Sequence, residues 1–251
     1  MNRMKFMKIY IDNVTMNEAL ERISYLTENT KHSYVVTPNV DHIVKLEKDP
    51  EFFEIYENAS LILTDGQPLI WISKLYKTSI IEKISGADLF PRVCKLAAQK
   101  KYKLFFLGAA EGVADIAATK LIMKYPGLNI VGTYSPKFGF ENDPNEIKNI
   151  INVIKENIPD ILIVGLGTPK QEKFIYRNKE LLNVPISLGV GASIDFEAGT
   201  QKRAPVWMSK CGLEWFYRLC REPHRLFKRY LIDDIKVIKL IWKYRKNKKL
   251  E

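Results

Sequence analysis

The chain contains 251 residues, of which 46% are hydrophobic and 27% charged, and its formal net charge is +10. A chain of this length and apolar content can bury one sizeable core, or one core and a small appendage, which excludes a disordered protein. No apolar run approaches the roughly 18 residues that a transmembrane helix requires. Met1–Tyr10 lacks the apolar core of a signal peptide, so we expect a cytoplasmic protein.

Short apolar runs rich in β-forming residues recur through the first 190 residues. They are Tyr34–Thr37, Leu61–Thr64, Leu104–Leu107, Ile130–Val131, Ile161–Val164 and Ile186–Val190. Amphipathic stretches of helical length lie between several of them, at Glu111–Tyr125, Pro144–Asn157 and Pro169–Leu182. This alternation predicts βαβ units, and therefore an α/β fold in which helices cover both faces of a mostly parallel sheet.

From about Gln201 the composition becomes almost continuously helical, and we expect Pro223 to divide this stretch into two or three helices. The last helix carries an apolar stripe at helical spacing, formed by Leu231, Ile235, Ile238 and Trp242. Another face carries Lys236, Lys239, Lys243 and Lys246. Such a basic amphipathic helix suits a membrane interface, although a helix packed on the protein's own core with solvated lysines has the same pattern.

The distribution of charge favours the membrane interpretation. Residues 202–251 contain 15 Lys and Arg against 5 Asp and Glu, whereas the first 201 residues contain 24 of each class. A neutral body with a basic end predicts an anionic partner for that end, such as a membrane surface or a nucleic acid. We therefore expect a catalytic domain over residues 1–200 and a basic, membrane-docking appendage over residues 201–251.

The cysteines and histidines carry no metal-binding pattern. The three cysteines have no spacing typical of metal ligation or of a redox pair, so we expect reduced thiols. The three histidines are scattered, without a Cys or carboxylate at zinc-like spacing. We expect neither a structural metal nor a cofactor.

The residues that follow each predicted strand are candidates for the site, because ligands of open parallel sheets bind at the carboxyl ends of the strands. The first run ends in Thr37-Pro38-Asn39, whose polar groups can bind a sugar or phosphate but are also common in turns and helix caps. The second run is followed by Asp65-Gly66. This carboxylate can act as the general base that an acceptor hydroxyl requires, or simply cap a helix.

Glycine-containing segments follow the third and fifth runs. Gly108 stands between a strand and a helix, where a phosphate can approach the helix N-terminus. This segment lacks the dinucleotide pattern G-x-G-x-x-G, and no acidic residue ends the next strand, which argues against a nicotinamide dehydrogenase. The most specific local pattern in the chain is Gly165-Leu166-Gly167-Thr168-Pro169-Lys170-Gln171-Glu172. Its lysine can offset diphosphate charge, and its Gln and Glu can bind sugar hydroxyls.

The last run is followed by Gly191 and then by the acidic pair Asp195 and Glu197. Such a pair can hold a divalent cation that bridges a diphosphate, so a metal-dependent sugar or nucleotidyl transferase is a second candidate function. A third candidate, from a different class, is a nucleic-acid-binding module with a basic tail. That interpretation leaves the glycine and carboxylate sites without a purpose.

Taken in order, these motifs and several later ones resemble the WecG/TagA/CpsF family of bacterial glycosyltransferases (glycosyltransferase family 26). The resemblance covers roughly residues 5–230, and each motif is weak by itself while the ordered set is specific. The motifs are Thr37-Pro38-Asn39, Asp65-Gly66, Ser85-Gly86-Ala87-Asp88, Gly108, the segments 165–172 and 189–196, Gly199, Arg203-Ala204-Pro205 and Glu214-Trp215.

The resemblance implies a Rossmann-like fold and an inverting, metal-independent transfer of a sugar to undecaprenyl-diphosphate-linked N-acetylglucosamine. The favoured donor is UDP-N-acetylmannosamine, which would make the disaccharide that links wall teichoic acid to peptidoglycan. The alternatives are its uronic acid form, glucose or galactose, for capsule, exopolysaccharide or common antigen. The expected partners are the UDP-sugar, the lipid-linked acceptor and the anionic inner face of the cell membrane, with self-association away from the membrane and no nucleic acid.

The resemblance also assigns residues to roles. Asp65 is the expected general base, preceded by Thr64 where the family usually has Ala. The expected substrate-positioning residues are Thr37, Asn39 and Gln171, together with Lys83, which stands where the family often has Arg. The appendage arginines Arg218, Arg221 and Arg225 are also expected to bind substrate, because their spacing places them on one helical face that can reach a diphosphate. The expected nucleotide-binding residues are Gly108, Gly165, Gly167, Lys170, Glu172, Gly191 and Asp195.

Overall fold

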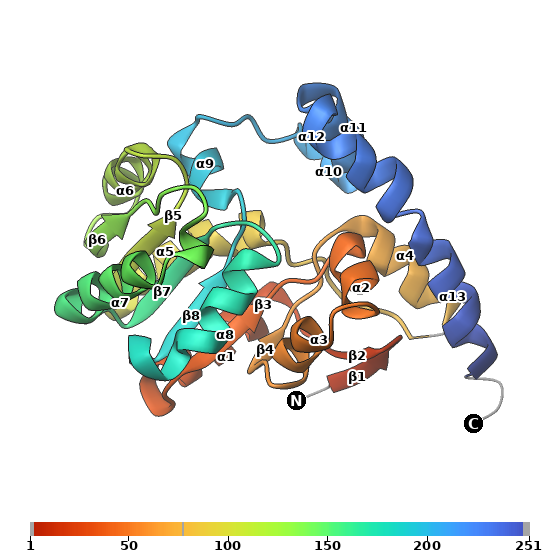
Figure 1. The fold of residues 1–251 in the computed structure, drawn as a ribbon, viewed down its shortest axis with the longest axis horizontal. Coiled ribbons are helices and arrows are strands. Elements are labelled where there is room, and N and C mark those ends of the chain that lie inside the picture. Colours follow the sequence, from red (N-terminus) through yellow and green to blue (C-terminus); the bar gives the residue numbers. More distant parts are fainter. Residues whose placement is uncertain (1–2, 77, 248–251) are drawn as a thin grey trace.

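A computed structural model describes residues 3–76 and 78–247, without the side chains at positions 206, 210, 225, 229, 232, 246 and 247. Its centre is a six-stranded sheet with the strand order β4-β3-β8-β7-β5-β6, and every neighbouring pair is parallel (Figure 1). The strands are β3 (Ser33–Val36), β4 (Leu61–Ile62), β5 (Lys103–Gly108), β6 (Asn129–Tyr134), β7 (Ile161–Gly165) and β8 (Ile186–Gly189). The expected α/β fold is confirmed, and each predicted run overlaps a strand.

Helices cover both faces of this sheet, because alternate residues of each strand point to opposite sides. In β7, Ile161 and Ile163 belong to one buried cluster, whereas Leu162 and Val164 belong to the other. The first cluster is covered by α1 (Met16–Asn29), α5 (Gly86–Lys100), α6 (Val113–Lys124) and α9 (Ser193–Ala198). The second is covered by α2 (Val40–Leu46), α3 (Pro50–Glu57), α4 (Gln67–Leu75), α7 (Pro144–Asn157) and α8 (Lys170–Leu182).

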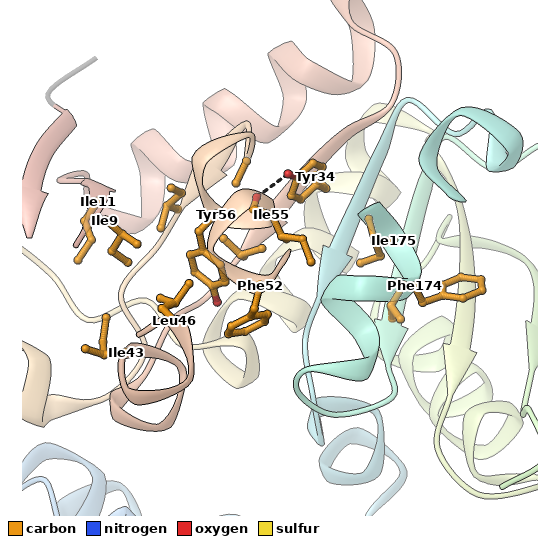
Figure 2. Close-up of a cluster of buried hydrophobic side chains, with 14 of the residues drawn as sticks. Ile9, Ile11, Tyr34, Ile43, Leu46, Phe52, Ile55, Tyr56, Phe174 and Ile175 are labelled. Carbon is orange, nitrogen blue, oxygen red and sulfur yellow. Dashed lines mark hydrogen bonds between the residues drawn. The ribbon is translucent and has the colours of Figure 1, made fainter. Parts of the chain in front are cut away.

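Figure 2 shows part of the second cluster, where side chains from α2, α3 and α8 meet those of an N-terminal hairpin. The hairpin consists of β1 (Arg3–Phe6) and β2 (Ile9–Asp12), which the sequence analysis did not predict. Asp12 fastens it to the sheet, since its carboxylate accepts hydrogen bonds from Arg3 at 2.9 Å and from the backbone N–H of Ile62 at 2.8 Å. The hairpin thus closes the core beside β4.

The last fifth of the chain is helical, as expected. It contains α10 (Val206–Lys210), α11 (Glu214–Arg221), α12 (Pro223–Lys228), a π-helical segment η2 (Arg229–Asp233) and α13 (Lys236–Asn247), hereafter the C-terminal helices. Pro223 begins α12, so the expected break is confirmed. The stretch is divided further than we predicted, because Gly212 adopts a φ of 73° between α10 and α11. A Cβ there would lie 2.6 Å from the ring of Trp71, so glycine permits close packing on α4.

Helix α13 lies beside α2 and α4 (Figure 1) and is apolar on two faces. Its inward face packs on the second cluster through Val237, Leu240, Ile241 and Tyr244. The predicted stripe is the outward face, where Ile235, Ile238 and Trp242 are 51%, 54% and 61% exposed. Within the described ranges, no helix combines the length and apolar character needed to cross a membrane.

Candidate active site

A cavity of about 400 Å³ lies between the strand-end loops of the sheet and the C-terminal helices. From the sheet side it is lined by Asn39, Asp65 and Lys83. From the C-terminal side it is lined by residues that include Glu214 and Arg218. Four residues that the sequence analysis assigned to the site, Asn39, Asp65, Lys83 and Arg218, are therefore brought together across more than 150 positions of sequence.

Asp65 reaches the cavity because β4 is short. After Ile62 the chain continues beside the end of β3, and the backbone N–H of Asp65 donates to the carbonyl oxygen of Pro38 at 2.8 Å. Gly66 then turns the chain with a φ of 99° and caps α4 without any side-chain hydrogen bond. The helix-cap alternative for Asp65 is therefore wrong, and its carboxylate lines the cavity instead.

The surroundings of Asp65 suit a general base. Burial and the nearby Glu214 carboxylate raise the pKa of Asp65 to about 6. The positive charges of Lys83, His42 and Arg218 oppose this rise. A carboxylate with a pKa near 6 is ionised at neutral pH and is a stronger base than an ordinary aspartate.

Lys83 connects the part of the chain that contains the sheet, residues 3–76 and 78–205 (hereafter the sheet domain), to the C-terminal helices. Its Nζ donates to Oγ of Ser209 at 3.0 Å, and it lies 3.7 Å from the Asp88 carboxylate and 4.0 Å from that of Glu214. Ser209 in turn donates to Glu214 at 3.0 Å. Two opposite charges therefore act on Asp65, that of Lys83 from the sheet side and that of Glu214 from the C-terminal helices.

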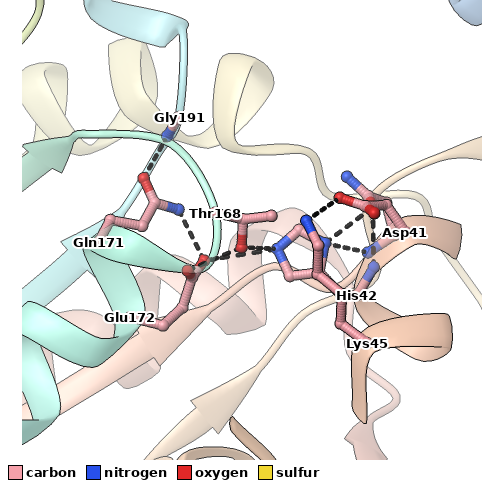
Figure 3. Close-up of polar contacts among 8 residues, drawn as sticks. Asp41, His42, Lys45, Thr168, Gln171, Glu172 and Gly191 are labelled. Carbon is pink, nitrogen blue, oxygen red and sulfur yellow. Dashed lines mark hydrogen bonds and ion pairs between the residues drawn. The ribbon is translucent and has the colours of Figure 1, made fainter. Parts of the chain in front are cut away.

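Asn39 is held by a hydrogen-bonded network, and Figure 3 shows the members His42, Thr168 and Glu172 of this network. Asn39 caps α2 together with His42, whose Nδ1 lies 2.7 Å from the Asn39 Oδ1. On the other side of the ring, Nε2 lies 2.8 Å from Oγ1 of Thr168, and Thr168 donates to Glu172 at 2.7 Å. The network thus joins the loop after β3 to the loop after β7.

Gln171 and Glu172 belong to this network and are absent from the cavity lining. Gln171 accepts from the backbone N–H of Gly191 at 3.0 Å and donates to Glu172 at 2.8 Å. Burial opposes ionisation of Glu172, but hydrogen bonds from His42, Gln171 and Thr168 hold its pKa below the ordinary value. In this structure both residues bind neighbouring loops of the protein, and their assignment to substrate or nucleotide stays a prediction.

The predicted glycines Gly108 and Gly165 end the neighbouring strands β5 and β7. From β5 the chain continues to β6 on one side of this pair, and from β7 it continues to β8 on the other side. Nucleotides typically bind at such a switch point of a parallel sheet. A Cβ on Gly108 would lie 2.4 Å from the carbonyl oxygen of Gly165, and one on Gly165 would lie 2.8 Å from that of Gly191. Glycine at these positions is therefore required by the contact between loops. Gly167 has a φ of 74° and open space around it. A role of these residues toward a nucleotide stays a prediction.

Three further candidates, Thr37, Lys170 and Arg221, do not line the cavity. Thr37 is buried, and Lys170 forms an ion pair with Glu141. Arg221 is exposed, with its guanidinium over the ring of Tyr217, and the side chain of Arg225 falls outside the described residues.

The acidic pair of the second candidate function is not assembled into a larger cluster. Glu197 forms an ion pair with Lys124 at 3.6 Å, and Asp195 also has an interaction partner. Over residues 3–76 and 78–247, no group of three or more His, Cys, Asp or Glu side chains could hold a metal ion.

The sequence analysis missed His42, Thr168, Ser209 and Glu214 as site residues. The spacing of Asn39 and His42, three residues apart at the start of α2, is that of a capping box, and it was the available signal for His42. Thr168 and Glu214 stand in motifs that carry the resemblance, but their contacts depend on segments that only the fold brings together, so the sequence analysis gave neither a role in the site.

Comparison with known proteins identifies the family of this chain. A model of the family described as "Glycosyl transferase WecG/TagA/CpsF family" matches residues 4–251. The N-acetylglucosaminyldiphosphoundecaprenol N-acetyl-beta-D-mannosaminyltransferase of Bacillus subtilis (strain 168) is 35% identical over 202 residues, covering 80% of this chain and 76% of that protein. The protein of the same name from Staphylococcus aureus (strain NCTC 8325 / PS 47) is 30% identical over 209 residues, covering 82% and 80%. This chain belongs to the WecG/TagA/CpsF family of glycosyltransferases.

Proposed function

We propose that this protein transfers N-acetylmannosamine from UDP-N-acetylmannosamine to undecaprenyl-diphosphate-linked N-acetylglucosamine, with inversion and without a metal ion. The names of its relatives support the donor and the acceptor. The observation that carries the chemistry is Asp65, a carboxylate with a pKa of about 6 in a cavity that also holds cationic side chains.

In the proposed reaction Asp65 removes the proton of the acceptor hydroxyl as that oxygen attacks the anomeric carbon of the donor. The bond between this carbon and the diphosphate oxygen breaks, and its electron pair leaves with UDP. Attack opposite the leaving group inverts the anomeric configuration in a single displacement. Lys83 and Arg218 line the same cavity, and both can offset the negative charge of a diphosphate there.

The C-terminal helices supply the proposed contact with the membrane. Leu231 of η2, Ile235, and Ile238 of α13 are exposed and also line the cavity, so the apolar outward face of this segment continues to the edge of the cavity. An anionic lipid surface attracts the lysines of this region, while the apolar side chains enter the interface. This arrangement would bring a lipid-linked diphosphate to Asp65 from the inner face of the cell membrane.

The test measures UDP release by the full chain with a short-chain lipid-diphosphate N-acetylglucosamine acceptor in buffer that contains EDTA. We expect release that requires the acceptor and UDP-N-acetylmannosamine, and a product whose new linkage has the inverted configuration by NMR. Release with the uronic acid, glucose or galactose donor instead would change the pathway. Activity that EDTA removes and Mg²⁺ restores would support the metal-dependent alternative, and silence with every donor would contradict the proposal.

A further inference from the structure

Two motifs that carry the family resemblance stand outside the reaction proposed above, and the structure brings them together. Arg203 belongs to the segment 202–205, which leads from α9 into α10 (Figure 1), and Asp88 lies in the first turn of α5. Nη2 of Arg203 donates to Oδ1 of Asp88 at 2.5 Å, and its Nη1 lies 3.5 Å from the carbonyl oxygen of Ala87. This ion pair attaches the entrance of the C-terminal helices to the start of α5.

The start of α5 is itself fixed beside the proposed base. The backbone N–H of Ile84 donates to the carbonyl oxygen of Thr64, the residue before Asp65, at 2.8 Å. Ser85 caps the helix, since its hydroxyl oxygen accepts from the backbone N–H of Asp88 at 3.1 Å. The same hydroxyl donates to Oδ2 of Asp88 at 2.7 Å, so this carboxylate is held in place before Arg203 reaches it.

A second attachment follows within the C-terminal helices. Nζ of Lys83 donates to Oγ of Ser209 in α10 at 3.0 Å and lies 3.7 Å from the carboxylate of Asp88. Ser209 donates to Glu214 of α11 at 3.0 Å. One contact leaves a helix free to pivot, whereas two contacts spaced along the chain fix its direction. The chain from Arg203 to Glu214 is therefore attached at both ends to residues around the start of α5.

Both members of the ion pair are partly buried, with side chains that are 33% and 31% exposed. Burial opposes the charge of Asp88, but hydrogen bonds from Ser85 and Arg203 hold its pKa below the ordinary value. Burial also opposes the charge of Arg203, but Asp88, followed by Glu214 and Asp65, raises its pKa. Arg203 does not line the cavity, so any effect on the reaction passes through the helices that it holds.

We propose that Arg203 and Asp88 are positioning residues, whose ion pair fixes α10 and α11 in the orientation that places Glu214 and Arg218 beside Asp65. This inference rests on the proposed function, because the groups that it positions are the base of that reaction and a cation that faces the diphosphate. Since the pair acts through the C-terminal helices, loss of either partner should have the same consequence for Asp65.

The first test measures how firmly the helices are held, and it needs no substrate. Hydrogen exchange of backbone amides is followed by mass spectrometry in the full chain and in the variants Arg203→Gln and Asp88→Asn. We expect residues 206–221 to exchange about tenfold faster in both variants, because a charge-assisted contact that opposes local opening is lost. Residues 144–157 of α7 should exchange as in the wild-type protein.

Arg177→Gln is the matched control for this test. Arg177 of α8 pairs with Glu51 of α3 at 2.6 Å, so its loss removes an ion pair of the same kind without touching the C-terminal helices. Exchange in residues 206–221 should be unchanged in this variant. Unchanged exchange there in Arg203→Gln and Asp88→Asn as well would overturn the proposal.

The second test separates positioning from a direct effect of charge on the base. Burial and Glu214 raise the pKa of Asp65. The side chains that lower it are Lys83, His42 and Arg218. Helices that lose their orientation remove burial and the Glu214 charge, which outweigh Arg218, so Asp65 stays ionised to lower pH. Both variants should therefore move the acidic limb of kcat/KM to lower pH.

Charge alone predicts a different result for the two variants. Loss of the Arg203 cation would raise the pKa of Asp65, whereas loss of the Asp88 anion would lower it. The two acidic limbs would then move in opposite directions, and this outcome would contradict a positioning role.

The third test uses kcat/KM at neutral pH. We expect each variant to lower it about tenfold or more, because a small displacement of Arg218 and of the cavity wall misplaces the substrate. In protein that already carries Arg218→Ala, the further loss caused by Arg203→Gln should be smaller, since residues that act through one another are not additive. Full additivity would show that Arg203 does not act through Arg218 and would overturn the proposal.

These outcomes also separate positioning from folding and from the proposed function. A lower melting temperature with unchanged kcat/KM and an unchanged acidic limb, per molecule of folded protein, would make the pair merely structural. If the wild-type protein transferred no sugar from any donor, the proposed function would fail. Hydrogen exchange would still decide whether Arg203 and Asp88 hold the C-terminal helices.

Discussion

The sheet domain and the C-terminal helices use their apolar residues in opposite ways. In the sheet domain, strand residues are buried from both faces, in two clusters whose buried members all belong to that domain, with the inward face of α13 packed against the second. In the C-terminal helices, α11 buries no residue, and large apolar side chains such as Trp207, Phe227 and Trp242 are exposed. Exposed apolar area of this kind needs a partner surface. On the proposed function, the base belongs to the first region and contact with the membrane surface to the second.

The largest effect is expected from removing the proposed base, Asp65, from the sheet domain. Asp65→Asn preserves size and removes the proton acceptor, so we expect acceptor-dependent UDP release to fall at least about 1,000-fold. Binding of UDP by calorimetry and the melting temperature should stay near those of the wild-type protein, because Asp65 caps no helix. Full activity in this variant would show that the base lies elsewhere.

The next largest effect tests whether the C-terminal helices also supply charge to the reaction. Arg218 lines the cavity, whereas Arg221, one turn away, is exposed and does not. Loss of a charge-assisted hydrogen bond costs about 1.5–3 kcal/mol, so Arg218→Ala should lower kcat/KM by about tenfold to a hundredfold. Arg221→Ala is the matched control and should have a smaller effect. Equal losses in both variants would indicate a general electrostatic role.

Apolar contact with the membrane should produce a smaller effect. We expect Trp242→Ser to weaken binding to anionic vesicles about tenfold or more, because a buried aromatic side chain contributes about 1.5–3 kcal/mol. Met123→Ser, at an exposed apolar position of α6, is the control and should bind as the wild-type protein does. Sedimentation with vesicles measures both. If the two variants weakened binding alike, the division between the regions would be wrong.

The smallest expected effect concerns the pH dependence of activity, which tests whether Glu214 of the C-terminal helices acts on Asp65 of the sheet domain. The activity of the wild-type protein should decline as the pH falls through about 6, because Asp65 becomes protonated there. Glu214 belongs to the C-terminal helices and raises this pKa, so Glu214→Gln should move the acidic limb of kcat/KM to lower pH. A limb that moves upward or stays in place would show that Glu214 does not act on the base.

The sequence predicts the fold well where local and tertiary signals agree. Helix α7 has the predicted bounds, because Asp143 caps it and Pro144 occupies its first turn. The N-terminal hairpin was missed although Phe6, Ile9 and Ile11 are buried, since each of its strands has only four residues and the lysines Lys5 and Lys8 lie among the apolar residues of this segment. The break at Gly212 was missed because it depends on contact with Trp71, far away in the sequence.

The candidate site was predicted less completely, for a physical reason. A polar residue after a strand can point into a cavity or toward the next loop, and local sequence does not distinguish the two. Asn39 and Asp65 line the cavity, whereas Gln171 and Glu172, in the most specific motif, bind neighbouring loops. The sequence gives the residue types of such a site, while the strand order decides their partners.

The charges around Asp65 come from both regions, with Lys83 and His42 on one side and Glu214 and Arg218 on the other. The basicity of Asp65 therefore depends on groups that the C-terminal helices contribute. On the proposed function, a nucleotide sugar bound at the sheet domain without those helices would meet a weaker base and no Arg218. Such a division of the site would protect an activated sugar from reaction with water until the C-terminal helices complete it.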